Sequence, residues 1–235
     1  MTDLHLLTTV SVGFLLGARH ALDADHLAAV STIIATQRDP KASGLVGAWW
    51  GVGHTATLLL AGVVCIALGL RIPPAWAILC ETTVGAMLLL LGGSLAWTLW
   101  RDRWHVHRHL HDGRAHLHLH THRTEAGHGH DHGGRPFLKP VVVGMVHGLA
   151  GSAALLLLVL STVRTMWEGL AYIAAFGLGS IVAMGVIGAL MSLPVIWSTG
   201  RGQQALAAVQ AAACLSSIGL GLRMLATQLP ALGLH

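Results

Sequence analysis

The chain has 235 residues, of which 54% are hydrophobic and only 10% are charged, with a mean hydropathy of +0.65. A soluble domain carries about 25% charged residues, so this composition predicts an integral membrane protein and excludes an ordinary soluble domain. The net charge of +4 lies mostly in one loop, and no exposed basic face with interleaved aromatic residues exists, which argues against nucleic-acid binding.

Six apolar segments, each of about the length that a bilayer requires, follow one another along the chain. We expect them near residues 6–34, 45–70, 75–100, 138–163, 167–191 and 204–226. The predicted fold is therefore all-α: a polytopic transmembrane helical bundle with a first three-helix half at residues 1–100 and a second at 137–235. The first segment is too long for a straight span of a ~30 Å core, so it either tilts and protrudes or breaks near Asp23–Asp25.

The two halves resemble each other weakly. GARHAL at residues 17–22 is similar to GMVHGL at 144–149, and WGVGH at 50–54 is similar to FGLGS at 176–180. Three spans separate the copies, which predicts inverted-topology repeats with a site at their midplane interface, as in transporters. Chance similarity between glycine-rich apolar helices is the alternative.

Positive charges are distributed unevenly among the predicted loops. Ten Arg and Lys residues fall in the first, third and fifth loops, whereas only Arg71 and Arg164 fall in the second and fourth. The positive-inside rule therefore predicts that the odd-numbered loops are cytoplasmic and that both termini lie outside.

A soluble insert at residues 101–136 separates the two halves. It has almost no apolar residues and is predicted to be a disordered, histidine-rich cytoplasmic loop. Its imidazoles should bind and buffer metal ions without setting the geometry of a translocation site, and a simple solvated spacer is the alternative. Eleven of the seventeen histidines lie here: His105, His107, His109, His111, His116, His118, His120, His122, His128, His130 and His132.

The first apolar segment contains two imidazoles and two carboxylates within seven residues: His20, Asp23, Asp25 and His26. Ionisable groups at membrane depth are costly, so such a cluster indicates a functional site. Imidazole nitrogen and carboxylate oxygen together suit a divalent transition metal. A polar cluster that only holds helices together is the alternative, although Ser, Thr or Asn usually serves that purpose.

Helical geometry and two further histidines extend this candidate metal site. On an ideal helix His20, Asp23 and His26 share a face about 120° wide, and Asp25 points elsewhere unless the helix is broken. Asp25 is then a candidate for orienting an imidazole. His54 and His147 are expected at comparable depth beside glycines, either as further ligands or as packing residues.

Two motifs resemble those of a known family. GARHALDADHL at residues 17–27 resembles the His-x4-Asp-His signature of the nickel/cobalt transporter (NiCoT) family, and WGVGHT at 50–55 resembles its second motif. The resemblance implies that His20, Asp25 and His26 are needed for passage of Ni(II) or Co(II), with His54 contributing. VHGLAGSAA at 146–154 replaces the family's later Asp-Thr-rich motifs and is similar to the short, six-span urease-accessory branch of nickel permeases.

We therefore expect a multi-pass transporter of divalent metal ions in a bacterial inner membrane, with Ni(II) or Co(II) as substrate and no resident cofactor. The motif favours uptake. Efflux, or an accessory protein that passes nickel to the maturation proteins of a nickel enzyme, is the alternative. A membrane metalloenzyme using the same cluster is also conceivable, but no H-E-x-x-H motif, nucleophile elbow or phosphate loop is present, so we do not expect an enzyme.

Overall fold

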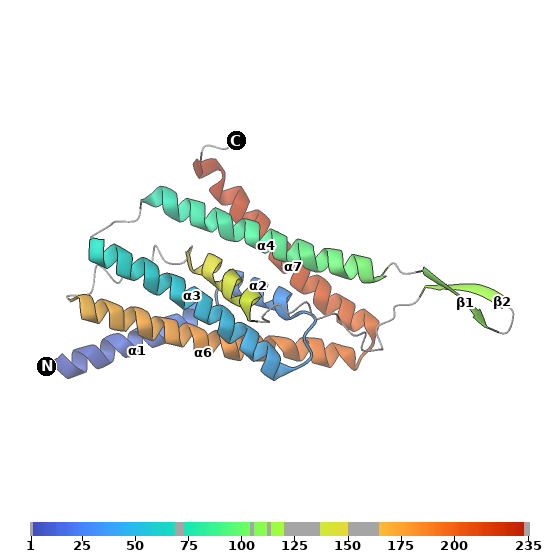
Figure 1. Ribbon diagram of the computed structural model, residues 1–235, viewed down its shortest axis with the longest axis horizontal. Coiled ribbons are helices and arrows are strands. Elements are labelled where there is room, and N and C mark those ends of the chain that lie inside the picture. Colours follow the sequence, from blue (N-terminus) through green and yellow to red (C-terminus); the bar gives the residue numbers. More distant parts are fainter. Residues whose placement is uncertain are drawn as a thin grey trace.

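The computed structural model describes residues 2–68, 73–103, 106–111, 114–119, 137–149 and 165–232, which form an elongated helical bundle with a small hairpin at one end (Figure 1). The helices are α1 (Thr2–His20), α2 (Ala24–Ile34), α3 (Pro40–Leu68), α4 (Pro74–Arg103), the helix Leu138–Leu149, α6 (Met166–Thr199), α7 (Gln203–Gln228) and the short 3-10 helix η1 (Pro230–Leu232). The strands are β1 (Val106–His111) and β2 (Arg114–Leu119).

Four of these helices are long and apolar enough to cross a membrane. The spans are Pro40–Cys65, Ala75–Arg101, Trp167–Thr199 and Gln203–Gln228. They confirm four of the predicted apolar segments as membrane-length helices. The predicted fourth segment is described as the helix Leu138–Leu149, and its remainder, 150–163, lies outside the described residues. Six spans in two inverted repeats stay a prediction.

The first apolar segment is broken. Helix α1 ends at His20 and α2 begins at Ala24, with two i to i−3 backbone hydrogen bonds tightening the end of α1. Asp23 then takes an extended conformation, with φ −63° and ψ 146°, which ends the helical path. Of the two predicted alternatives, the structure has the break, and the single helical face predicted for His20, Asp23 and His26 is wrong.

Helix α6 packs closely against both α1 and α3 through glycines. A Cβ at Gly17 would collide with the α6 backbone at Phe176, and Gly17 accepts a hydrogen bond of 3.0 Å from the Ser180 hydroxyl. On α3, the Thr55 hydroxyl donates to the Gly177 carbonyl at 3.2 Å. Such backbone approach through small residues is typical of helix packing in membranes, and it joins these three helices into one unit.

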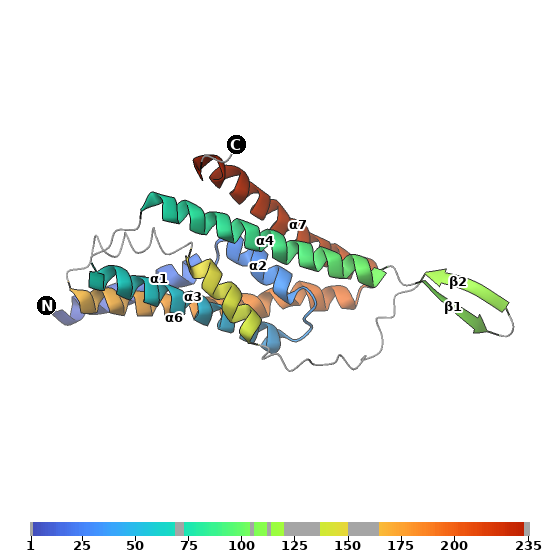
Figure 2. The same ribbon diagram turned by 45° about the horizontal axis from the view of Figure 1, so that its top comes forward.

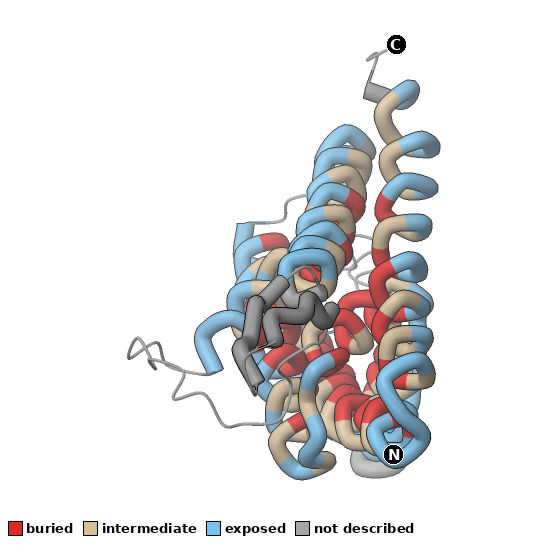
Figure 3. Tube along the Cα trace, turned by 90° about the vertical axis from the view of Figure 1, so that its right-hand side faces the viewer, coloured by how far each residue is buried: buried red, intermediate tan, exposed pale blue. Residues whose placement is uncertain are grey.

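Helices α4 and α7 form a second, antiparallel pair, and α2 lies between this pair and the α1–α3–α6 unit (Figure 2). At the end of α2 the Gln210 side-chain amide donates to the Ala35 carbonyl at 3.1 Å. Apolar residues of α2 pack against Val84 and Leu88 of α4 and Met184 of α6. Viewed along the bundle, buried residues lie mainly on the sides of the helices that face one another, and exposed residues lie mainly on the outer sides (Figure 3).

The outward sides of the long helices are strongly apolar. Large exposed side chains include Leu15, Leu60, Leu90 and Leu190, which are 57–74% exposed. Contiguous apolar surface of this kind needs lipid or another apolar partner to cover it. The chain is therefore a membrane protein by the length of its helices and by the composition of its surface.

Apart from the break between α1 and α2, many helix ends lie at one of two opposite ends of the bundle (Figures 1 and 2). The ends of α2, α4 and α6 and the starts of α3 and α7 lie at the same end as the hairpin, whereas the N-terminus lies at the other end (Figures 1 and 2). In the sequence, Arg38 lies between α2 and α3, Lys41 in the first turn of α3, Arg101 in the last turn of α4 and Arg201 between α6 and α7. These four of the ten loop charges thus belong to helix ends that lie at one end of the bundle.

The hairpin differs from the predicted disorder of residues 101–136. Strands β1 and β2 pair in antiparallel fashion, with His107 opposite His118 and His109 opposite His116. For these two strands the prediction of disorder is wrong, and the all-α class holds for the bundle alone. The sequence of each strand alternates with a period of two, and the intervening Asp-Gly pair is typical of hairpin turns. The rest of the loop, including the other six histidines, lies outside the described residues.

Candidate metal centre

The helix break brings the predicted ligands of the membrane segment together. His20 ends α1, Asp23 lies in the break, and Asp25 and His26 are in the first turn of α2. His54 lies midway along α3, and His147 belongs to the helix Leu138–Leu149. Every one of these six residues has a hydrogen bond or ring contact with another member of the set. We call this set the metal centre.

Three imidazoles form the first part of the centre. Three ring nitrogens lie within 4.8 Å of one another, and each belongs to a different residue: His20, His26 or His54. The ring centroids are 4.6 Å apart for His20 and His26, and 5.3 Å from His54 to each of the others. His26 and His54 are buried, whereas the side chain of His20 is 15% exposed. A cation among these rings can exchange water for nitrogen ligands.

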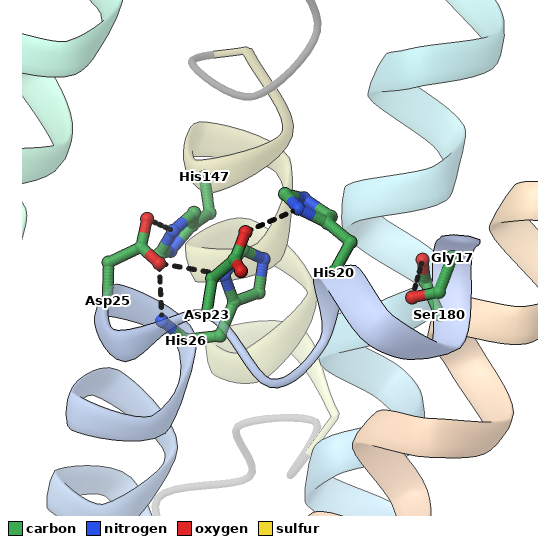
Figure 4. Close-up of polar contacts among 7 residues, drawn as sticks. All are labelled: Gly17, His20, Asp23, Asp25, His26, His147 and Ser180. Carbon is green, nitrogen blue, oxygen red and sulfur yellow. Dashed lines mark hydrogen bonds and ion pairs between the residues drawn. The ribbon is translucent and has the colours of Figure 1, made fainter. Parts of the chain in front are cut away.

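Two carboxylates bind the Nδ1 edge of two of these rings, which leaves the Nε2 edge of each ring available (Figure 4). Asp23 accepts from Nδ1 of His20 at 2.8 Å, and Asp25 accepts from Nδ1 of His26 at 3.0 Å. With the proton assigned to Nδ1, the lone pair of each neutral ring is on Nε2. Both Nε2 atoms are buried without a partner among the described residues. Proteins commonly orient metal-binding histidines by this carboxylate–imidazole arrangement.

Asp25 also connects the centre to His147. Its second carboxylate oxygen accepts from Nε2 of His147 at 2.8 Å, and its first also accepts from the backbone amide of His26 at 2.9 Å. Asp25, His26 and His147 therefore form a second group whose ligand atoms lie within 4.8 Å of one another. The side chain of Asp25 is 28% exposed, while His147 is buried.

Several buried nitrogens of the centre are unsatisfied within the described part of the chain. Both ring nitrogens of His54 and Nδ1 of His147 have no hydrogen-bond partner there. A neutral imidazole carries one N–H and one lone pair, and leaving a buried polar group unpaired costs about 1–3 kcal/mol. A bound transition-metal ion would use these lone pairs, so the ligands fit such an ion.

Trp50 forms a wall of the centre that was not predicted from the sequence. Its ring is fully buried, with its centroid 5.4 Å from both the His26 and the His147 ring centroids. The sequence does contain a signal for this role of Trp50, because Trp50 precedes His54 by four residues and so lies on the same face of the helix. The indole covers the rings with apolar surface, which keeps water away from that side of the ligands.

The fold and the centre together define a helical membrane protein with a largely buried cluster of histidines and carboxylates among its helices. Residues 6–198 match the family model NicO, described as high-affinity nickel-transport protein, and the chain belongs to this nickel-transport family. The predicted resemblance to nickel/cobalt transporters is thereby confirmed.

Two relatives support this assignment. The urease accessory protein UreH of Bacillus sp. (strain TB-90) is 36% identical over 201 residues, which are 86% of this chain and 83% of the relative. A high-affinity nickel transport protein of Cupriavidus necator is 39% identical over 59 residues, which are 25% of this chain and 17% of the relative. No solved structure matches the chain.

Proposed function

We propose that this protein carries Ni(II), and Co(II) as a second substrate, into the cytoplasm across a bacterial inner membrane. The observation that carries the proposal is the group of three imidazoles, two of them held by carboxylates, inside a member of a nickel-transport family. Ni(II) and Co(II) both accept imidazole and carboxylate ligands and are neighbours in the affinity order of divalent metals, which is why we include both.

In this proposal the six residues of the metal centre have distinct tasks. His20, His26 and His54 bind the ion through ring nitrogens after it loses part of its hydration shell. Asp23 and Asp25 orient the rings and supply negative charge that stabilises a divalent cation beside the buried imidazoles. His147 holds the second oxygen of Asp25.

The proposed topology has six spans, with the halves 1–100 and 137–235 as inverted repeats and both termini outside. The antiparallel packing of α3 with α6, and of α4 with α7, supports it, because an axis in the membrane plane would relate these pairs. Arg38 and Arg201, in the connections before α3 and α7, and Lys41 in the first turn of α3 support a cytoplasmic location for the hairpin end, where these two helices begin.

The histidine-rich loop would then hold metal on the cytoplasmic side and modulate transport.

A second function, delivery of nickel to the maturation proteins of a nickel enzyme, is favoured by one observation: the relative that covers most of the chain is named a urease accessory protein. Transport and delivery are compatible, since the loop could receive the ion that the bundle releases.

Flux of radiolabelled nickel into oriented proteoliposomes tests the proposal. His20→Ala, Asp25→Ala and His26→Ala should each abolish or nearly abolish flux in protein that is folded and inserted. His5→Ala is the matched control, because His5 lies at the opposite end of α1 with its side chain 53% exposed, and it should retain normal flux. Normal flux in all three centre variants, or flux only in the outward direction, would overturn the proposed uptake through this centre.

A further inference from the structure

His26 belongs to both groups of potential ligands in the metal centre. One group is His20, His26 and His54, and the other is Asp25, His26 and His147. The His26 ring is central: its centroid is 4.6 Å from that of His20 and 4.2 Å from that of His147. Figure 4 shows this ring between His20 on one side and Asp25 with His147 on the other.

We propose that the ion occupies two adjacent positions in turn and that His26 remains a ligand in both. The first position is formed by His20, His26 and His54, and the second by Asp25, His26 and His147. This inference rests on the proposed transport function and adds a route within it. His147 then has a task beyond holding Asp25, as a ligand of the second position.

The two nitrogens of the His26 ring allow it to serve both positions. Nε2 is buried and unpartnered among the described residues, so it is available to the first position. Nδ1 contacts Asp25 and is available to the second once the ion replaces that hydrogen bond. In each position the proton of the neutral ring is on the nitrogen that the ion does not use, so transfer of the ion between the positions includes transfer of that proton between Nδ1 and Nε2.

The burial of the two groups suits access from two sides. His26, the shared ligand, is 2% exposed, whereas each group has one member with a partly exposed side chain, His20 at 15% and Asp25 at 28%. Each position therefore has its own partly open edge, and a buried ring separates the two edges. Because the two groups of ligands are adjacent, an ion that passes from one to the other is without protein ligands only over a short distance, which limits the cost of its charge in the membrane.

The two positions also differ in charge, which gives them different ligand fields. The first offers three neutral imidazoles, and the second offers two imidazoles and a carboxylate.

Co(II) is a useful probe because its visible absorption depends on the identity and number of its ligands. We therefore use Co(II) on the purified full chain in detergent, with the eleven loop histidines replaced by asparagine to remove their binding.

Three variants of the centre test the proposal. His147→Gln should bind one Co(II) with the spectrum of the first position, and His54→Gln should bind one Co(II) with a different spectrum, that of the second. The double variant His54→Gln with His147→Gln should lower affinity at least 100-fold. Both single variants should lose at least 10-fold in nickel flux, while His5→Gln, the matched control, should change neither binding nor flux.

The possible results separate this inference from the proposed function. Identical Co(II) spectra in the two single variants, two ions bound at once by the parent chain, or normal flux in His147→Gln would each overturn the two positions. If His147→Gln does not fold, His147→Asn and Asp25→Asn provide the same comparison. Absence of nickel flux in the parent chain would instead overturn the transport function, and the two spectra would still decide whether two positions exist.

Discussion

Gly148→Ala should disable the metal centre without altering any of its ligands. Gly148 follows His147, at the point where the helix Leu138–Leu149 approaches α3 beside the centre. A Cβ there would lie 2.6 Å from the carbonyl oxygen of His54 and 3.1 Å from its Cα. Ordinary contact begins near 3.4 Å, so the two backbones must separate by about 0.8 Å, the difference between 3.4 Å and 2.6 Å.

This displacement exceeds the tolerance of about 0.5 Å within which a working site holds its groups. It would move His54 and His147 apart. Because His147 is hydrogen-bonded to Asp25, the carboxylate of Asp25 would also be displaced. We expect nickel flux at limiting metal to fall about 10-fold or more, since a misplacement of about 1 Å can reduce the rate at a catalytic site by about 100-fold. Overpacking should also lower the free energy of unfolding by about 1–3 kcal/mol.

The assay compares radiolabelled nickel uptake and thermal unfolding in detergent with those of Gly93→Ala. Gly93 lies on α4, and a Cβ added there would meet no neighbouring atom within 4 Å, so its substitution adds the same methyl group in open space. Uptake by Gly148→Ala equal to that of Gly93→Ala would refute the argument that this close approach positions the ligands.

Three further predictions address other parts of the molecule. Asp23→Asn should weaken nickel binding about 10–100-fold, because the ring of His20 loses its orienting carboxylate; unchanged affinity in equilibrium dialysis would contradict that role. A cysteine at Gly113, in a chain without native cysteines, should resist impermeant thiol reagents added outside intact cells, and ready labelling would reverse the proposed topology. Deletion of residues 105–132 should leave flux measurable at saturating nickel but alter the response at low nickel; complete loss in a folded deletion would place an essential ligand in the loop.

The composition of the metal centre could be predicted from the sequence, but its geometry could not. His20, Asp23, Asp25 and His26 are conspicuous because they interrupt an apolar segment. A regular helix would point Asp25 away from the other three. The extended backbone at Asp23 changes this, and Asp25 then contacts both His26 and His147. Polar residues within a hydrophobic segment indicate that a site exists, but local periodicity does not show where a break redirects the side chains.

The contact between Asp25 and His147 depends on tertiary packing, because the two residues are 122 positions apart. The sequence associated His147 with the cluster only through its expected depth in the membrane and through the weak likeness between the sequences around His20 and His147. The hairpin shows the opposite error. Polar composition predicted disorder in residues 101–136, but β1 and β2 form strands, and the prediction did not weigh their period-two alternation or the Asp-Gly pair between them.

The position of α2 has a consequence for the order in which the protein matures. Its 11 residues extend about 16 Å at 1.5 Å per residue, about half of the ~30 Å hydrocarbon core. It does not cross the core alone and is enclosed by α4, α6 and α7. At its end the side-chain amide of Gln210 on α7 donates a hydrogen bond to the carbonyl of Ala35. Because α7 follows the other long helices in the sequence, α2 is fully enclosed only after α7 has been synthesised and has packed against α4.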